Sequence, residues 1–261
     1  MTEKTKREWL AGLRRIPVLV ILAVCAAFIF RSVLFAPFFV PSGSMMPVLR
    51  VGDFFIASRF DYGISPRSFV ATASASPSIG RSLPKRGDIV VFLNPSDLRQ
   101  KMVKRVVGLP GDRIEINAGN LMINGETVSR SRVSDFLAKV EPGVSCVVVP
   151  GVVDQNDHLS DGEDACRFGR AVETLPGGEQ FATIDIAPAH SDFFPSTIVP
   201  QGNVFVMGDN RDDSLDSRFP RWEGGVGFVP VDNLLGKLRF VIGNNEAGSR
   251  FIGMRDVPDQ P

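Results

Sequence analysis

The sequence predicts a mainly β protein behind a single N-terminal transmembrane helix. Three observations support this class. Residues 16–30 form an apolar run in which Cys25 is the single polar side chain. Later segments are short and rich in β-branched residues, as strands are. The 25 Gly and 19 Pro are spread between these segments as turn residues, a pattern typical of antiparallel sheets.

The strands are predicted one by one from short apolar or alternating runs. Residues 109–112 (LPGD) and the Asn124-Gly125 pair predict turns, the second of them a tight hairpin turn. The predicted strands are residues 88–93, 102–107, 113–117, 121–123, 147–153 and 204–207.

Composition and charge exclude several classes of protein. The 261 residues include 29 Lys+Arg and 29 Asp+Glu, so the formal net charge is zero, and 44% are hydrophobic. These values exclude a disordered or collagen-like chain and disfavour a basic nucleic-acid binder, so no nucleic-acid partner is expected. At about 150 residues per domain, the length allows one or two domains. Residues 1–15 carry a net charge of +3, directly before the apolar run.

The apolar run predicts a membrane anchor over residues 16–36. Its 15-residue core corresponds to about 22 Å of helix, and extension to Ala36 takes in Arg31, which can snorkel to the headgroups. A cleaved signal peptide is the alternative, but no small-residue cleavage site follows the core. The basic leader then places residues 1–15 in the cytoplasm and the rest outside, with one span only.

The few cysteine and histidine residues limit the possible chemistry. An oxidising compartment permits a disulfide between Cys146 and Cys166, with two buried free thiols as the alternative. His158 and His190 lie in polar stretches, where a solvated or structural histidine is expected rather than a triad member. The acidic residues of 154–170 do not fit a calcium loop. No metal site and no cofactor are therefore expected.

A hydrolase without a histidine partner can activate a serine with a neutral lysine. Burial lowers a lysine pKa because it penalises the ammonium form. Lys104 fits, because strand alternation places it on the face of Met102 and Val106. Arg105 shares the other face, but an arginine cannot deprotonate in a protein. Periodicity alone leaves open that Lys104 only snorkels from a strand edge.

A candidate nucleophile lies in the segment PSGSMMP, residues 41–47, just after the predicted anchor. Two serines, Ser42 and Ser44, flank Gly43, which permits a sharp backbone path that exposes an amide donor. An ordinary juxtamembrane linker has a similar composition, so the residues alone do not decide between the two interpretations.

Four segments follow one another along the chain: PSGSMMP after an N-terminal span, RGDIVVF, KRVVGLPGD and MGDNRDDSLDSR. In this order they resemble the sequence boxes of bacterial type I signal peptidases (leader peptidases). One such box is a weak signal, whereas four in order are specific. The resemblance implies a membrane-bound serine endopeptidase with a complex antiparallel β catalytic core, residues 37–114 and 201–261. It also implies an inserted β subdomain, residues 115–200.

The resemblance also implies roles for single residues. Ser44 corresponds to the nucleophile and Lys104 to the general base. The N–H of Ser44 and the hydroxyl of Ser42 correspond to the oxyanion hole. Ser214 corresponds to the residue that orients the lysine amine. Asp216 and Arg218 correspond to an ion pair that holds the last segment, MGDNRDDSLDSR, against the catalytic core. Asp209, Asn210 and Arg211 match the family in residue type and are expected to be structural.

The implied partners are preprotein signal peptides, the lipid bilayer and the protein-export translocon. The implied location is the inner (plasma) membrane, single-pass, with a cytoplasmic N-terminus and a periplasmic or extracytoplasmic catalytic domain. Five phenylalanines are predicted either to dip into the lipid interface or to form ordinary core: Phe35, Phe38, Phe39, Phe54 and Phe55.

Three other hypotheses stay open at this point. The chain resembles a Ser/Lys peptidase, so a specialised processing peptidase for conjugation or pilus export is one alternative. A non-catalytic, anchored extracytoplasmic binding module is another. Residues 71–75 (ATASA) also have small side chains in a cleavage-like spacing, which suggests self-cleavage.

Overall fold

The computed structural model describes residues 20–22, 24, 34–63, 80, 82–139, 165–185, 189–242 and 251–253. The chain divides into two compact units, Met1–Ala36 and Pro37–Pro261. In the first unit, residues 20–22, 24 and 34 are helical. Within the described ranges, we find no helix with the length and apolar character that crossing a bilayer requires. Most of the predicted anchor, residues 71–75, the strand 147–153, Cys146 and His158 lie outside the described residues.

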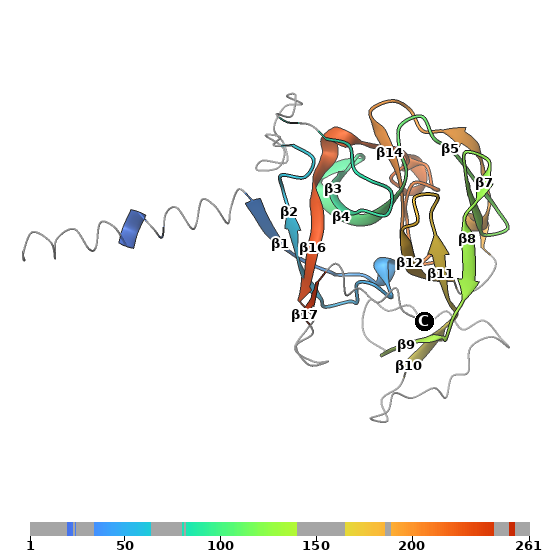
Figure 1. The fold of residues 1–261 in the computed structure, drawn as a ribbon, viewed down its shortest axis with the longest axis horizontal. Coiled ribbons are helices and arrows are strands. Elements are labelled where there is room, and N and C mark those ends of the chain that lie inside the picture. The colour runs from blue at the N-terminus through green and yellow to red at the C-terminus, as the bar shows by residue number, and fades with distance from the viewer. Residues whose placement is uncertain are drawn as a thin grey trace, which may run out of the picture. The chain divides into compact units, whose positions relative to one another are not determined.

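The second unit is built from antiparallel β-sheets, which confirms the mainly β prediction (Figure 1). Its largest sheet has eight strands in the order β1-β2-β16-β3-β4-β14-β15, with β17 paired to β16. The strands of this sheet are β1 (Phe35–Phe39), β2 (Phe54–Ser58), β3 (Ile89–Asn94), β4 (Asp97–Gly108), β14 (Asn203–Met207), β15 (Val229–Pro230), β16 (Leu234–Ile242) and β17 (Phe251–Gly253).

Three smaller sheets come from the middle of the chain. They have the orders β13-β5-β6-β7, β12-β11-β8 and β10-β9. Their strands are β5 (Arg113–Asn117), β6 (Asn120–Ile123), β7 (Glu126–Thr127), β8 (Ser129–Arg132), β9 (Phe136–Lys139), β10 (Ala165–Phe168), β11 (Arg170–Thr174), β12 (Gln180–Ile184) and β13 (Phe194–Ile198). Four short 3-10 turns complete the described elements: η1 (Gly43–Met45), η3 (His190–Asp192), η4 (Arg221–Glu223) and η5 (Val231–Asn233).

Strand β3 is buried on both faces, and this explains its unbroken apolar sequence. Ile89, Val91 and Leu93 belong to one hydrophobic cluster, whereas Val90 and Phe92 belong to another. A strand with two covered faces needs apolar side chains at every position, not at alternate ones. The pairing of β3 with β4 is continuous from Ile89 to Leu93 and shifts register only at Asn94, so this central strand fixes the position of the residues opposite it.

The tight turn predicted at Asn124-Gly125 joins β6 to β7, and both residues have positive φ, 55° and 87°. Such angles are those of the turn that matches the twist of a two-stranded hairpin. Cys166, in β10, is disulfide-bonded. The prediction that Cys146 is its partner falls outside the described residues. His190 is exposed at the start of η3, in agreement with a solvated histidine.

Candidate active site

The structure brings Ser44 and Lys104 into direct contact. Ser44 lies in η1, and Lys104 lies in β4 opposite Val90 of β3. The amine of Lys104 donates a hydrogen bond of 2.6 Å to the Ser44 hydroxyl, between residues 60 positions apart in the chain. Both side chains are buried, with relative exposures of 9% for Ser44 and 3% for Lys104. Ser44 and Lys104, which were predicted from two separate motifs, therefore belong to one site.

The nucleophile candidate lies on a rigid turn rather than in a linker. Gly43, Ser44 and Met45 form one 3-10 turn and are all buried. The N–H of Met46 donates to the Gly43 carbonyl at 3.0 Å, and the N–H of Leu49 donates to the Met45 carbonyl at 2.9 Å. Met45 is fully buried in the main hydrophobic cluster and holds the turn against the sheet. The position of the Ser44 hydroxyl is thus set by core packing.

Burial lowers the pKa of Lys104 from its ordinary 10.5 to about 8. Desolvation is the largest cause, because the amine has lost the water that would stabilise its charge. The carboxylates of Asp216, Asp213 and Asp209 oppose this effect and raise the pKa. The effect of desolvation on the pKa is larger than that of the three carboxylates, so a substantial fraction of the amine is neutral near pH 8 and able to accept a proton.

Ser214 lies close to this pair but is bonded to a different group. Its hydroxyl donates to a carboxylate oxygen of Asp216 at 2.8 Å. Among the described residues, the structure gives no hydrogen bond between Ser214 and the Lys104 amine.

Position 208 requires a glycine, because a Cβ at this position would lie 2.3 Å from the Ser214 hydroxyl and 2.6 Å from the Ser44 carbonyl oxygen.

Asp216 and Arg218 form the predicted ion pair, and it is fully buried. The Arg218 guanidinium contacts both carboxylate oxygens of Asp216 at 2.9 Å. Burial by itself raises the pKa of Asp216, but the charge and hydrogen bonds of Arg218 outweigh it and leave the pKa below its ordinary value. Removing one partner of such a pair costs about 3–5 kcal/mol because the other charge stays buried.

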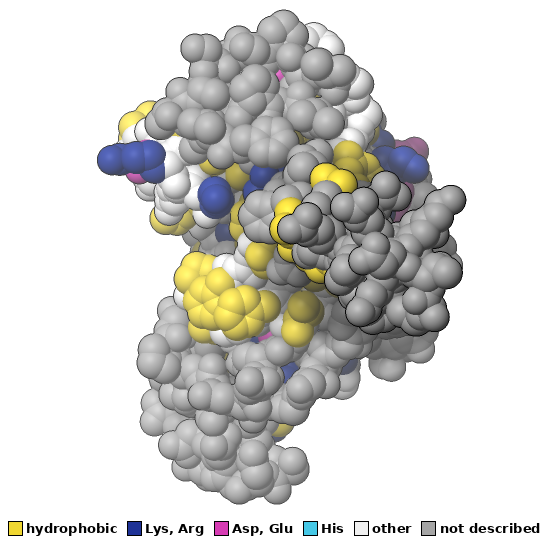
Figure 2. Space-filling view, turned by 90° about the vertical axis from the view of Figure 1, so that its left-hand side faces the viewer, with side chains coloured by type: hydrophobic (Ala, Val, Ile, Leu, Met, Phe, Trp, Pro, Cys, Tyr) yellow, Lys and Arg dark blue, Asp and Glu magenta, His cyan; other side chains and the backbone are white. Residues whose placement is uncertain are grey.

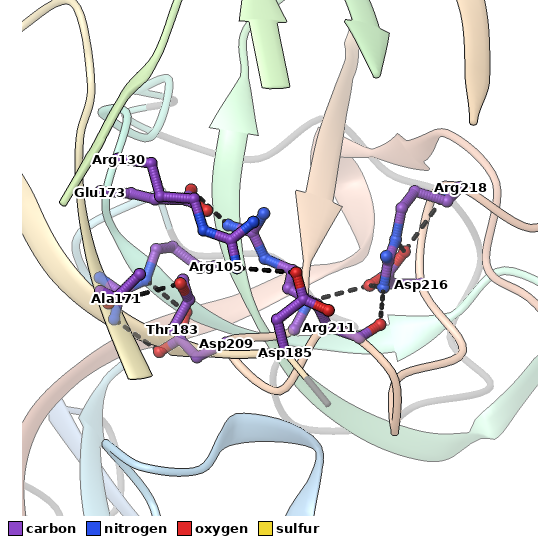
Figure 3. Close-up of polar contacts among 11 residues, drawn as sticks. Arg105, Arg130, Ala171, Glu173, Thr183, Asp185, Asp209, Arg211, Asp216 and Arg218 are labelled. Atoms are coloured by element: carbon purple, nitrogen blue, oxygen red, sulfur yellow. Dashed lines mark hydrogen bonds and ion pairs between the residues drawn. The ribbon is translucent and has the colours of Figure 1, made fainter. Parts of the chain in front are cut away.

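Further ion pairs surround this loop, and they link it to neighbouring strands (Figure 3). Arg105 contacts both carboxylate oxygens of Asp209 at 2.7 Å, and its guanidinium lies 4.1 Å from the ring centre of Phe181. Arg211 bonds to Glu173 of β11 at 2.5 Å, with both side chains buried. Glu173 is a residue that sequence reasoning missed, because no local pattern marks a glutamate of a half-buried strand as a partner of a distant loop.

Asn210 is a second residue whose role the sequence did not reveal. It was predicted to be structural by type alone, but it contacts the η1 turn that carries Ser44 directly. Its backbone N–H donates to the Ser44 carbonyl at 3.2 Å, and its side-chain amide donates to the Gly43 carbonyl at 3.2 Å. Ser42 precedes the turn, is exposed, and makes no hydrogen bond through its hydroxyl to the described part of the chain.

Three carboxylates lie close together outside this site. Ligand oxygens of Asp185, Asp192 and Asp212 are within 4.8 Å of one another. Asp185 is paired with Arg130 at 2.7 Å, and the charge of Arg218 lies near Asp192 and Asp212. Neighbouring guanidinium groups therefore balance the charge of this acidic cluster. Among the described residues, no hydrogen bond joins the cluster to Ser44 or Lys104.

A serine hydroxyl bonded to a buried lysine on an antiparallel β scaffold is the arrangement of serine hydrolases that use lysine in place of histidine. The chain belongs to the signal peptidase family, peptidase S26, whose family model matches residues 13–243.

Individual relatives agree with this family. Signal peptidase I of Rickettsia typhi is 32% identical over 228 residues, which cover 84% of this chain and 75% of the relative. Signal peptidase I of Rickettsia prowazekii matches with the same identity and coverage. A crystal structure of a signal peptidase I from Enterococcus faecalis is 26% identical and covers 60% of this chain and 97% of its own, with a TM-score of 0.31.

Replacing Lys104 by methionine is expected to stabilise the protein while it removes the amine. A folded-state pKa of about 8 against an ordinary 10.5 means that the buried lysine lowers the free energy of unfolding by roughly 3 kcal/mol at pH 7. This penalty is fully present below pH 8 and disappears as the pH rises toward 10.5. Lys104→Met should therefore raise the free energy of unfolding at pH 7, and the gain should shrink by pH 10.

Urea unfolding of the full chain in detergent at both pH values measures the effect. The control is Lys85→Met at an exposed lysine, where a change within about 0.5 kcal/mol is expected. Equal destabilisation by Lys104→Met at both pH values would contradict the prediction.

Proposed function

We propose that this signal peptidase cleaves the signal peptides of exported preproteins with Ser44 as nucleophile and Lys104 as general base. The observation that carries the proposal is the 2.6 Å hydrogen bond between the two side chains, formed by an amine whose pKa burial has lowered to about 8. A general base must lie within hydrogen-bond reach of the proton it takes and must be neutral at the working pH. Lys104 meets both conditions for Ser44.

In the proposed acylation step, the Lys104 amine takes the proton of the Ser44 hydroxyl while the oxygen attacks the scissile carbonyl carbon. The carbonyl π bond breaks and its electron pair moves to the oxygen. When the C–N bond then breaks, the Lys104 ammonium gives its proton to the leaving amine. The mature protein departs with a new N-terminus, and the signal peptide stays bound to Ser44 as an ester.

Deacylation repeats these proton movements with water in place of the serine. Lys104 takes a proton from the water, whose oxygen attacks the ester carbon, and it then returns the proton to the Ser44 oxygen as the C–O bond breaks. The oxyanion of both steps needs donors, and we assign these to the Ser44 N–H and the Ser42 hydroxyl. The exposed Ser42 hydroxyl, with no partner in the described residues, is available for this role. Each such donor contributes about 2.7–4 kcal/mol to the transition state.

We assign Ser214 as the group that orients the Lys104 amine. Its hydroxyl proton is directed to Asp216, so its lone pairs are left to accept a hydrogen bond from the amine. Asp216 is in turn held by Arg218. Together they keep a carboxylate close to the ammonium that forms during acylation, which limits the cost of a buried positive charge.

The proposed substrate binds as an extended strand with small residues at the first and third positions before the cut. Strand addition at a sheet edge presents alternate side chains to two pockets, which agrees with this spacing. We further propose that residues 16–36 anchor the enzyme in the plasma membrane, with residues 1–15 in the cytoplasm and the β domain outside. The catalytic β core then comprises 37–114 and 201–261, with the inserted β subdomain at 115–200. The export translocon is the expected source of substrates.

A patch of hydrophobic side chains on the β domain fits a lipid surface. Phe39 and Phe54 are 53% and 51% exposed, and their rings lie 5.3 Å apart. Register places Phe54 beside Ile242, and the exposed Phe240 beside Ile56. Figure 2 views the molecule from the left-hand side of Figure 1 and shows hydrophobic side chains, in yellow, gathered on the face toward the viewer.

We propose that this patch, Phe39, Phe54, Phe240 and Ile242, contacts the bilayer, because Phe39 follows the proposed anchor by only three residues. The other phenylalanines have different roles: Phe55 is buried core, and Phe38 is half-buried against it.

Substitution of either proposed catalytic residue should abolish cleavage of a fluorescent preprotein in detergent while the fold stays intact. Ser44→Ala removes the nucleophile and Lys104→Ala removes the base. Lys104→Arg should be equally inactive, because an arginine keeps the charge but cannot accept a proton at pH 8. Initial rates and circular dichroism measure the two properties. Substantial activity in Lys104→Arg would show that this residue is not the base.

The pH dependence of kcat/KM should report the Lys104 amine. Activity requires its neutral form, so kcat/KM should fall about tenfold per pH unit below pH 8. Asp213 raises the pKa of Lys104 through its charge. Asp213→Asn should therefore lower that pKa and move the acid limb to lower pH. Asp97→Asn, at an exposed carboxylate paired with Arg99, is the matched control and should leave the limb in place; a limb unmoved in Asp213→Asn would contradict the assignment.

The double variant Phe39→Ser/Phe54→Ser should act selectively on substrates in a bilayer. We expect the ratio of the cleavage rates for a preprotein in liposomes and a short soluble peptide to fall several-fold, because apolar area at the lipid surface is lost. Phe193→Ser removes a phenylalanine that is 62% exposed elsewhere and serves as the control. An equal ratio in wild type and double variant would argue against a lipid-facing patch.

A further inference from the structure

One residue from a distant segment, through its side chain and its backbone, holds both carbonyl groups next to the proposed nucleophile. Asn210 follows β14, lies 167 positions from Gly43, and is 1% exposed. Its side-chain amide donates to the Gly43 carbonyl and its backbone N–H donates to the Ser44 carbonyl, each at 3.2 Å. The peptide groups on both sides of Ser44 are therefore anchored to the same residue.

The bond to Gly43 has a consequence for the amide of Ser44. The Gly43 carbonyl and the Ser44 N–H belong to one planar peptide group, in which they point in opposite directions. The same carbonyl also accepts the N–H of Met46 at 3.0 Å. With two donors on the carbonyl, the peptide plane cannot rotate freely, and the direction of the Ser44 N–H is set.

Asn210 is itself held on its other side. It forms a parallel β-bridge with Ile184 at the end of β12. The N–H of Arg211 donates to the Ile184 carbonyl at 2.9 Å, and the N–H of Ile184 donates to the Asp209 carbonyl at 2.9 Å. The side-chain oxygen of Asn210 accepts the N–H of Asp213 at 3.3 Å. The amide group thus has one orientation, with its donor toward Gly43.

We propose that Asn210 is a positioning residue that directs the Ser44 N–H toward the oxyanion of the tetrahedral intermediate. The proposal rests on the proposed role of Ser44 as nucleophile. Asn210 touches neither the substrate nor the Lys104 amine in this arrangement, so it acts through the Gly43–Ser44 peptide alone. Its loss should weaken transition-state binding, with little effect on substrate affinity or on the protonation of Lys104.

The test uses Asn210→Ala and Asn210→Asp in the full chain, with a small-residue peptide substrate in detergent. Both variants remove the amide donor and keep the backbone bond to Ser44, and the aspartate also keeps the acceptor for Asp213. We expect kcat to fall about 100-fold, the effect of a misplaced catalytic group. KM should stay within about twofold, and in Asn210→Ala, which adds no charge, the acid limb of the pH profile should not move.

A peptide aldehyde probes the oxyanion site without turnover. The Ser44 oxygen adds to the aldehyde carbon, the C=O π bond opens, and the serine proton passes to Lys104, so the former carbonyl oxygen becomes an oxyanion. The inhibition constant in the Asn210 variants should rise by about the same factor as kcat falls. An unchanged kcat and inhibition constant in folded Asn210→Ala would overturn the proposal, as would equal losses in kcat and substrate affinity.

Asn233 offers a matched control. It is also buried, and its side-chain amide donates to the Leu93 carbonyl of β3 at 3.1 Å. Asn233→Ala should lower the melting temperature but leave kcat and the aldehyde inhibition constant of the folded enzyme unchanged. Ser44→Ala separates the proposed role of Ser44 as nucleophile from the proposed positioning role of Asn210. If Ser44→Ala is active, the proposed nucleophile fails, whereas normal kcat in Asn210→Ala with an inactive Ser44→Ala overturns only the positioning role.

Discussion

The neutral state of the Lys104 amine, which is hydrogen-bonded to the Ser44 hydroxyl, depends on keeping the amine away from water. In solvent the amine would be charged near neutral pH and would have no capacity to accept a proton. Burial lowers its pKa to about 8, although Asp216, Asp213 and Asp209 act in the opposite direction. The surrounding fold must therefore be dry enough to neutralise a lysine and acidic enough to tolerate it once protonated.

This balance explains why so many ion pairs lie around the site. The loop after β14 carries Asp209, Arg211, Asp216 and Arg218, and each has a buried partner of opposite charge. Buried pairs of this kind add little net stability compared with apolar packing. Their effect is geometric, because the pairs with Arg105 and Glu173 hold the loop against β4 and β11, and the Asp216–Arg218 pair fixes the loop internally. The same loop supplies Ser214 and Asn210, so the geometry of the Ser44–Lys104 pair and that of the η1 turn depend on one segment.

Much of the fold was predictable, because strands and turns are encoded by neighbouring residues. The alternating and apolar runs located β3 to β6 and β14, and the Asn124-Gly125 pair located a hairpin turn that the structure confirms. The five phenylalanines near the anchor show the limit of such patterns. Phe54 and Phe55 are adjacent in one strand, yet one is exposed and the other is buried. Composition cannot separate them, because the difference depends on which face of β2 is covered.

By itself, the sequence determined the family, the strands β3 to β6 and β14, and the two candidate catalytic residues, because each depends on short contiguous motifs. Only the tertiary structure decided that Ser44 and Lys104 are 2.6 Å apart and that Asn210 and Glu173 support the site. These partners are separated by 38 to 167 positions. Which distant segments meet is settled by packing of the whole core, and local periodicity contains no information about that choice.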